Sequence, residues 1–163
     1  GYFTVLTNLF VALAFTSAAR GGERPALGRP AVLGCATASI AMVGLVYHLV
    51  LRELWAPQGA QWLADMLLHY AVPIAVVAHW LACSRALALP WSLALAWCAW
   101  PLGYLVYALL RGAVLGSYPY PFIDVTALGY AKTFVNSAGL LLAFVAVALA
   151  VIAVTRSRRP APA

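Results

Sequence analysis

Residues 65–73 read Asp65-Met-Leu-Leu-His69-Tyr-Ala-Val-Pro73, so an acid, a histidine and a proline stand inside an apolar run that continues to Leu81. With its flanks, this run is long enough to enter a bilayer, where ionisable side chains are costly and are functional candidates. On a helix, Asp65 and His69 share one face. Pro73 has no N–H to bond the carbonyl of residue 69, which should loosen the backbone there. The alternative interpretation is a packing histidine capped by Asp65, beside a simple proline kink.

The composition of the whole chain is that of an integral membrane protein. Of its 163 residues, 65% are hydrophobic and only 9% are charged, and the mean hydropathy is +0.92. Soluble domains carry about 25% charged residues. The net charge of +6 comes from basic residues scattered at helix ends, without a basic stripe, and so does not indicate binding to nucleic acid. Cys35, Cys83 and Cys98 lie in apolar runs without metal-ligand spacing, and we therefore expect no metal and no cofactor.

Five apolar segments are each long enough to cross a bilayer, which takes about 20 residues. They cover residues 2–19, 31–52, 62–82, 90–110 and 129–155. The sequence therefore predicts an all-α fold, a polytopic transmembrane helix bundle with five visible spans. Because the chain begins without a methionine, we expect a sixth span upstream in the full-length protein. Residues 1–155 would form a single transmembrane domain, and residues 156–163 a disordered basic tail.

The basic residues predict the orientation of the bundle, because Lys and Arg are enriched on the cytoplasmic side of membrane proteins. Seven of the ten fall on the same side as the C-terminus, namely Arg20, Arg24, Arg29, Arg85, Arg156, Arg158 and Arg159. The other three, on the opposite side, are Arg52, Arg111 and Lys132. We therefore expect a multi-pass protein with a cytoplasmic C-terminus.

This orientation collects polar side chains from four of the segments into one layer near the outer side. The layer comprises Thr4, Thr7, Asn8, His48, Asp65, His69, Asn136 and Ser137. The inner half carries fewer polar groups. Because the segments could have placed these groups at any depth, the layer is the predicted functional site.

The predicted outer loop, residues 111–128, contains the aromatic stretch Tyr118-Pro-Tyr-Pro-Phe122. Residues that precede proline are biased away from helix, so this stretch should be extended. It could cover the polar layer as a lid that contacts substrate, or it could be an aromatic anchor at the membrane interface. The predicted lid residues are Tyr118, Tyr120, Phe122 and Asp124.

A hydroxyl and an imidazole are the minimum equipment for acyl transfer, in which the hydroxyl attacks a carbonyl and the histidine takes its proton. Thr4 and Thr7 are the candidate nucleophiles, and an acid such as Asp65 can orient the ring of His69 from behind. Either Asn8 or Asn136 could donate to a developing oxyanion. Threonines in membrane helices also bond their own backbone or a neighbouring helix, and that purely structural role is the alternative.

Four stretches, in their order and spacing, resemble the bacterial six-transmembrane Pr-six-Pr proteins, which are similar to the eukaryotic androgen-induced membrane hydrolases. They are Tyr2-Phe-Thr4-Val-Leu-Thr-Asn8, Asp65-x-x-x-His69-x-x-x-Pro73, Trp100-Pro-Leu-Gly-Tyr104, and Tyr118-Pro-Tyr-Pro-Phe-Ile-Asp124 followed by Gly129-Tyr130. The resemblance covers nearly the whole chain, less the family's first helix. It implies a bacterial inner-membrane protein that contacts membrane lipids. It also implies an intramembrane threonine hydrolase of fatty acid esters, in which Thr4 matches the nucleophile and His69 the catalytic histidine.

Two other functions fit the same residues. His48 and His69 lie at similar depth on different segments, and two histidines on facing helices can ligate one haem. A transporter or assembly partner without enzymatic activity would use broken helices, for which Pro73 and Pro101 are candidate kinks, although no inverted repeat is visible. The sequence indicates no particular protein partner.

Overall fold

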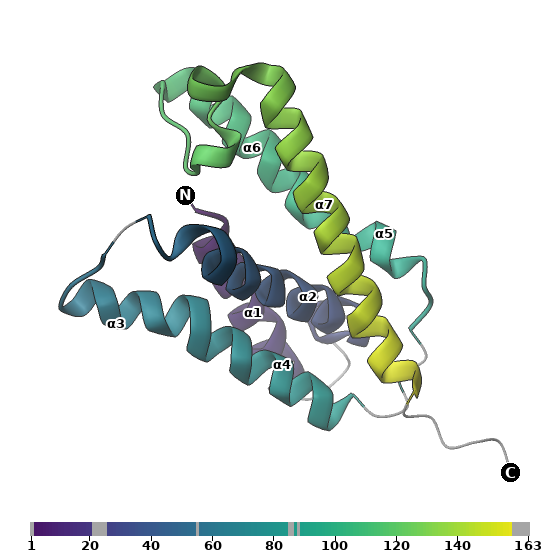
Figure 1. Ribbon diagram of the computed structural model, residues 1–163. Helices are drawn as coiled ribbons and strands as arrows, with labels where there is room; N and C mark the ends of the chain where they lie inside the picture. Colours follow the sequence, from purple (N-terminus) through teal and green to yellow (C-terminus); the bar gives the residue numbers. More distant parts are fainter. Residues whose placement is uncertain (1, 21–25, 55, 85–86, 88, 158–163) are drawn as a thin grey trace, which may run out of the picture.

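The computed structural model describes residues 2–20, 26–54, 56–84, 87 and 89–157, and within these residues the chain is helical and contains no strand (Figure 1). The α-helices are α1 (Phe3–Ala19), α2 (Pro30–Val46), α3 (Ala60–Met66), α4 (Val72–Cys83), α5 (Leu93–Trp97), α6 (Ala99–Leu115) and α7 (Val125–Ser157). Two π-helical turns, η2 (Tyr47–Leu51) and η3 (Leu67–Ala71), and two 3₁₀ turns, η1 (Ala26–Gly28) and η4 (Pro121–Ile123), complete the set. The predicted tail from residue 158 onward, with Arg24 and Arg85, lies outside the described residues.

Four helical segments are long and apolar enough to cross a membrane. They are Pro30–Leu51, Ala60–Cys83, Leu93–Leu115 and Val125–Arg156. The predicted all-α class is confirmed, but the fifth predicted span is not. Residues 2–19 form helix α1, which has 17 residues and is shorter than the roughly 20 that a hydrocarbon core requires.

Helix α2 is the central element of the bundle and contacts α1, α4 and α7 (Figure 1). Its buried positions are rich in small side chains, which allow neighbouring backbones to approach closely. The buried positions of α2 are Gly34, Ala36, Thr37, Ala38, Ser39, Ile40, Met42 and Val43. Two apolar clusters form around it, one with Trp80, Trp97 and Phe144, the other with Val11 and Val76.

Two glycines set how closely α2 meets its neighbours. A Cβ added at Gly34 would lie 2.7 Å from the Trp97 ring, so this ring packs directly on the α2 backbone. A Cβ at Gly44 would lie 3.2 Å from the Pro73 Cβ and 3.3 Å from the His69 carbonyl oxygen. Gly44 therefore seats α2 against the turn that carries His69.

The segment predicted as the outer loop, residues 111–128, starts later than expected, whereas its predicted end coincides with a break in the helical backbone. Helix α6 continues to Leu115 and ends at Gly116, whose left-handed backbone (φ 67°) suits a residue without a side chain. Helix α7 already begins at Val125, because the Asp124 carboxylate accepts hydrogen bonds from the N–H groups of Thr126 and Ala127. The bonds from Thr126, first of all from its hydroxyl, hold the pKa of the Asp124 carboxyl below its usual range. Asp124 thus caps the first turn of α7. At Gly129 the backbone leaves the helical conformation (φ 73°, ψ 162°), so the rest of α7 starts where the fifth apolar segment was predicted to begin.

Gly44→Ala tests the close seating of α2. Alanine stabilises a helix interior by about 0.5–1 kcal/mol relative to glycine, but at residue 44 the methyl group meets a proline ring and a backbone carbonyl. We expect Gly44→Ala to lower the free energy of unfolding in mixed micelles by about 1 kcal/mol. The matched control is Gly103→Ala, where the added Cβ has no neighbour within 4 Å and stability should rise. An equal rise in both variants would show that α2 does not pack tightly at residue 44.

Candidate functional site

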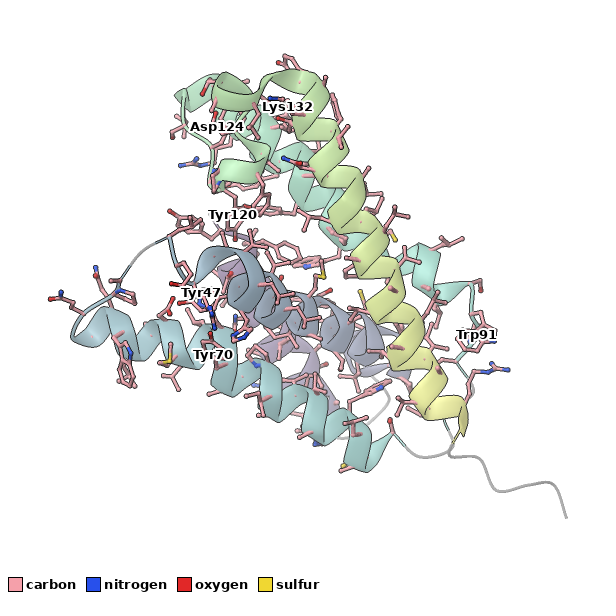
Figure 2. All side chains as sticks on the ribbon, in the orientation of Figure 1. Tyr47, Tyr70, Trp91, Tyr120, Asp124 and Lys132 are labelled. Carbon is pink, nitrogen blue, oxygen red and sulfur yellow. The ribbon has the colours of Figure 1, made fainter. Side chains whose placement is uncertain are left out.

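Four parts of the chain meet at one end of the bundle, which we call the site end. They are the first turns of α1, the end of α2 with η2, the continuous helix of α3 and η3, and the loop that contains η4. Figure 2 shows Tyr47, Tyr70 and Tyr120 at this end, whereas Trp91 lies at the other end of the molecule. Arg156 reaches the Trp91 ring there, with its guanidinium carbon 5.3 Å from the ring centroid.

Thr4 and His69, which are 65 positions apart in the chain, come together at the site end. The Oγ1 of Thr4 lies 3.1 Å from the Nε2 of His69, and the Thr4 side chain is buried. The other ring nitrogen, Nδ1, lies 3.1 Å from both the backbone oxygen and the Oδ1 of Asp65. Because Nδ1 faces two acceptors, it carries the ring proton, which leaves Nε2 to accept the hydrogen bond from the Thr4 hydroxyl.

Tyr47, which the sequence analysis did not single out, completes the environment of the imidazole. Its ring stacks on His69 with centroids 3.9 Å apart and planes at 16°, and its hydroxyl donates to the Oδ2 of Asp65. Tyr47 and Asp65 are both buried, so the two carboxyl oxygens are hydrogen-bonded out of water. The available signal was a tyrosine near the outer end of the second apolar segment, directly before His48.

The π-helical turn η3 changes which carbonyl the proline leaves unpaired. The N–H of Val72 donates to the carbonyl of Leu67, five positions back. In this register the carbonyl of Leu68 would accept a hydrogen bond from residue 73, but Pro73 has no N–H to donate. The Nδ2 of Asn8 instead donates to the Leu68 oxygen at 3.3 Å and to the Thr4 oxygen at 2.9 Å. The expectation of a loosened carbonyl at His69 is therefore corrected to Leu68, and the Asn8 amide ties α1 to this turn.

Thr7, the other candidate nucleophile, is fully buried between α1 and α6. Its Oγ1 accepts a hydrogen bond of 3.2 Å from the indole N–H of Trp100. The two threonines thus have different surroundings: Thr4 faces an imidazole and an open groove, whereas Thr7 joins two helices.

Two other predicted residues lie away from the Thr4–His69 pair. His48 is exposed, and its Nδ1 lies 3.2 Å from the Tyr70 hydroxyl. The amide of Asn136 donates to the Phe122 backbone oxygen at 3.0 Å and so ties α7 to the loop. In the part of the chain that the structure describes, no three His, Cys, Asp or Glu side chains gather as a metal site would require.

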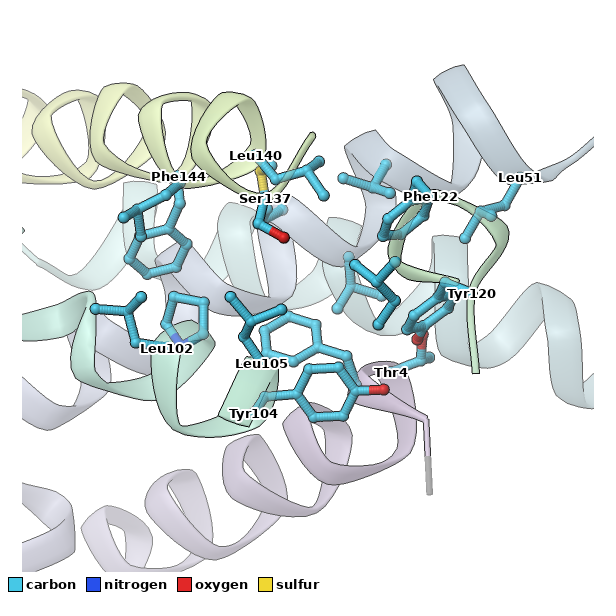
Figure 3. Close-up of a pocket in the computed structure, with 17 residues that line it drawn as sticks. Thr4, Leu51, Leu102, Tyr104, Leu105, Tyr120, Phe122, Ser137, Leu140 and Phe144 are labelled. Atoms are coloured by element: carbon cyan, nitrogen blue, oxygen red, sulfur yellow. The ribbon is translucent and has the colours of Figure 1, made fainter. Parts of the chain in front are cut away.

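The aromatic loop is packed down on the site end. The Tyr118 ring lies on Gly112, where an added Cβ would be 2.1 Å from it. Tyr120 is in extended conformation, stacks on Phe122 with centroids 5.1 Å apart, and turns its hydroxyl toward Thr4 (Figure 3). Burial raises the pKa of the Tyr120 phenol, although polar contacts with the Thr4 side chain and with the backbone of Phe3 and Thr4 act against that rise. The phenol therefore stays protonated beside Thr4.

Two cavities meet at Thr4, Leu51 and Tyr120, which line both. The first is a pocket of about 110 Å³ whose walls come from α1, α2, α6, α7 and the loop (Figure 3). The second is an open groove of about 440 Å³ that is lined by Tyr47, Gln61, Asp65 and His69 among others. The Thr4 hydroxyl thus stands on the boundary between an apolar pocket and a more polar groove.

Comparison with family models, with characterised proteins and with solved structures returned no match for this chain. The functional interpretation therefore depends on the geometry at Thr4, His69 and Asp65.

Tyr47→Phe tests the hydrogen bond that completes the Asp65 carboxyl. Removing the phenol leaves a buried oxygen without its donor, which costs about 1–3 kcal/mol of unfolding free energy. The control is Tyr70→Phe, because the Tyr70 hydroxyl bonds the exposed His48 and its loss should change stability by less than about 0.5 kcal/mol. Denaturant titration of both variants in mixed micelles gives the comparison. Equal effects would mean that the Tyr47–Asp65 bond contributes nothing specific.

Proposed function

We propose that this protein is an integral membrane hydrolase that cleaves a lipid ester with Thr4 as nucleophile and His69 as general base. The observation that carries the proposal is the 3.1 Å separation between Thr4 Oγ1 and His69 Nε2, with Asp65 against the far side of the ring. The resemblance to the Pr-six-Pr proteins and the androgen-induced hydrolases supports it, because both family positions fall on these two residues.

The reaction follows from the hydrogen bonds at the site. His69 Nε2 takes the proton of the Thr4 hydroxyl as the oxygen attacks the ester carbonyl. The bond to the alcohol oxygen then breaks, and the imidazolium returns the proton to the leaving alkoxide. Water, activated by the same nitrogen, hydrolyses the acyl-threonine and restores the hydroxyl. Asp65 holds the ring orientation and stabilises the imidazolium that forms.

Tyr120 is the better candidate to stabilise the oxyanion than the two predicted asparagines. The amides of Asn8 and Asn136 are engaged with backbone carbonyls. The protonated phenol of Tyr120 points to Thr4 and can donate a hydrogen bond to charge that develops on a carbonyl next to it. The loop would then act as part of the catalytic apparatus and not only as a cover.

The apolar helices and the asymmetry of basic residues support a location in the bacterial inner membrane, with the C-terminus in the cytoplasm. The site end would then lie toward the outer leaflet. A lipid substrate could reach the groove sideways from the bilayer, and the lipids of that leaflet are the expected partners.

Thr4→Ala and His69→Gln test the nucleophile and the base. Both variants should lose labelling by a fluorophosphonate hydrolase probe and should lower fatty acid ester hydrolysis by more than about 100-fold. The double variant should be no worse than either single variant, because residues that act as a unit are not additive. The control is Thr7→Ala, which removes a helix contact and should keep most activity. Full activity in Thr4→Ala would contradict the assignment of Thr4 as nucleophile. Loss of activity only in Thr7→Ala would assign the nucleophile to Thr7, one turn along α1.

The proposed orientation is tested by cysteine accessibility in a variant whose own three cysteines are replaced by serine. A cysteine at residue 27 should react with an impermeant maleimide only from the cytoplasmic side, and one at residue 117 only from outside. Both positions are exposed. The reverse labelling pattern would overturn the topology.

A further inference from the structure

We infer that the ester binds across Thr4 in one direction, with its acyl chain in the apolar pocket and its alcohol part in the groove beside His69. The pocket is also matched to a short acyl chain. This inference rests on the proposed function for the direction of catalysis, but its binding geometry can be tested without turnover.

The position of His69 determines the direction in which the ester binds across Thr4. In the proposed reaction the leaving alkoxide must receive its proton from the His69 Nε2, so the alcohol oxygen has to lie on the side of Thr4 that faces the imidazole. His69 and Asp65 line the groove and do not line the pocket. The acyl substituent of a carbonyl held at Thr4 is thereby left on the opposite side, at the mouth of the pocket.

The chemistry of the pocket wall fits a hydrocarbon chain. Beyond Thr4 and the tyrosines at its mouth, the polar lining is Ser137, whose hydroxyl already donates to the Thr133 backbone oxygen at 2.8 Å. The rest is aliphatic or aromatic, with Met42, Val46, Leu102 and Phe144 among the lining residues. A polar alcohol part would lose its hydrogen bonds to water there without gaining others. A methylene chain has no such hydrogen bonds to lose, and its burial is favourable.

The size of the pocket limits the chain. A protein cavity of about 150 Å³ lined by apolar side chains holds one benzene molecule, or six carbons. At about 110 Å³, this pocket holds roughly four carbons beyond the carbonyl on the same scale. The groove, at about 440 Å³, accommodates the larger part of the substrate and offers Gln61 as a polar contact. The preferred substrate class is therefore a short-chain acyl ester of a larger, amphipathic alcohol.

Leu102 and Phe144 lie at the end of the pocket away from Thr4 (Figure 3). Leu102 is 43% exposed, so a larger side chain can be introduced there without overpacking the core. Leu102→Trp should shorten the pocket. The matched control on the same helix is Leu110→Trp, because Leu110 is 64% exposed and lines neither cavity.

The binding arm uses the Thr4→Ala protein and pentyl ketone analogues that cannot be hydrolysed, with a photoreactive diazirine at one end or the other. A diazirine at the acyl end should label the peptides that contain Leu102 or Phe144. A diazirine at the alcohol end should label the stretch from Gln61 to Leu68, which lines the groove. Exchanged labelling, or labelling by both probes on the same segment, would overturn the inference whether or not the protein hydrolyses esters.

The kinetic arm compares acetyl and pentanoyl esters of one alcohol. In the native protein the pentanoyl ester should be hydrolysed faster, and Leu102→Trp should reduce its kcat/KM about 10-fold while sparing the acetyl ester. Leu110→Trp should change neither. A protein that turns over neither ester but gives the expected labels would refute the proposed function and keep the binding geometry. Turnover with an unaltered chain-length profile in Leu102→Trp would refute the pocket assignment alone.

Discussion

The buried carboxyl group of Asp65 is the constraint on which the site end depends. A carboxyl among apolar helices is tolerated only where its oxygens have hydrogen-bond partners. Here one oxygen meets His69 on the same helix and the other meets Tyr47, so η2 and the continuous helix of α3 and η3 have to converge on one residue. Gly44 makes that convergence possible, because a side chain at this position would keep α2 away from the turn that carries His69. The position of the imidazole, and with it the geometry at Thr4, follows from satisfying this one group.

The sequence was sufficient to predict the all-α class and the meeting of Thr4 with His69 at one end of the bundle. Hydropathy determines where helices can cross a membrane, and the i, i+4 spacing determines that Asp65 and His69 share a face. Only the family resemblance favoured Thr4 over Thr7 as the candidate nucleophile, since both lie in the same part of α1. The two threonines have different surroundings because Thr7 bonds Trp100, 93 positions away, and no local sequence pattern predicts that contact.

Other features could not be read from periodicity. Tyr47 reaches Asp65 from a π-helical turn, whose residues do not follow the 3.6-residue repeat used to assign faces. The boundary of the loop depended on Asp124 acting as a helix cap and on Gly116 ending α6, both of which are local signals that a hydropathy window averages away. Helix α1 matches the predicted segment 2–19 to within one residue, but its 17 residues are fewer than the roughly 20 that a membrane span requires.

The π-helical turn η3 separates the angular setting of the two halves of one membrane helix. In an α-helix each residue is rotated by about 100° about the axis from the one before it. The side-chain direction of Asp65 would therefore be fixed relative to those of Pro73 and the packing residues of α4. The extra residue taken up between Leu67 and Ala71 introduces a phase difference between the halves. The packing half can therefore follow α2 while the half with the acid faces the groove. One inserted residue therefore allows the two halves of a single membrane helix to turn different faces toward the rest of the bundle.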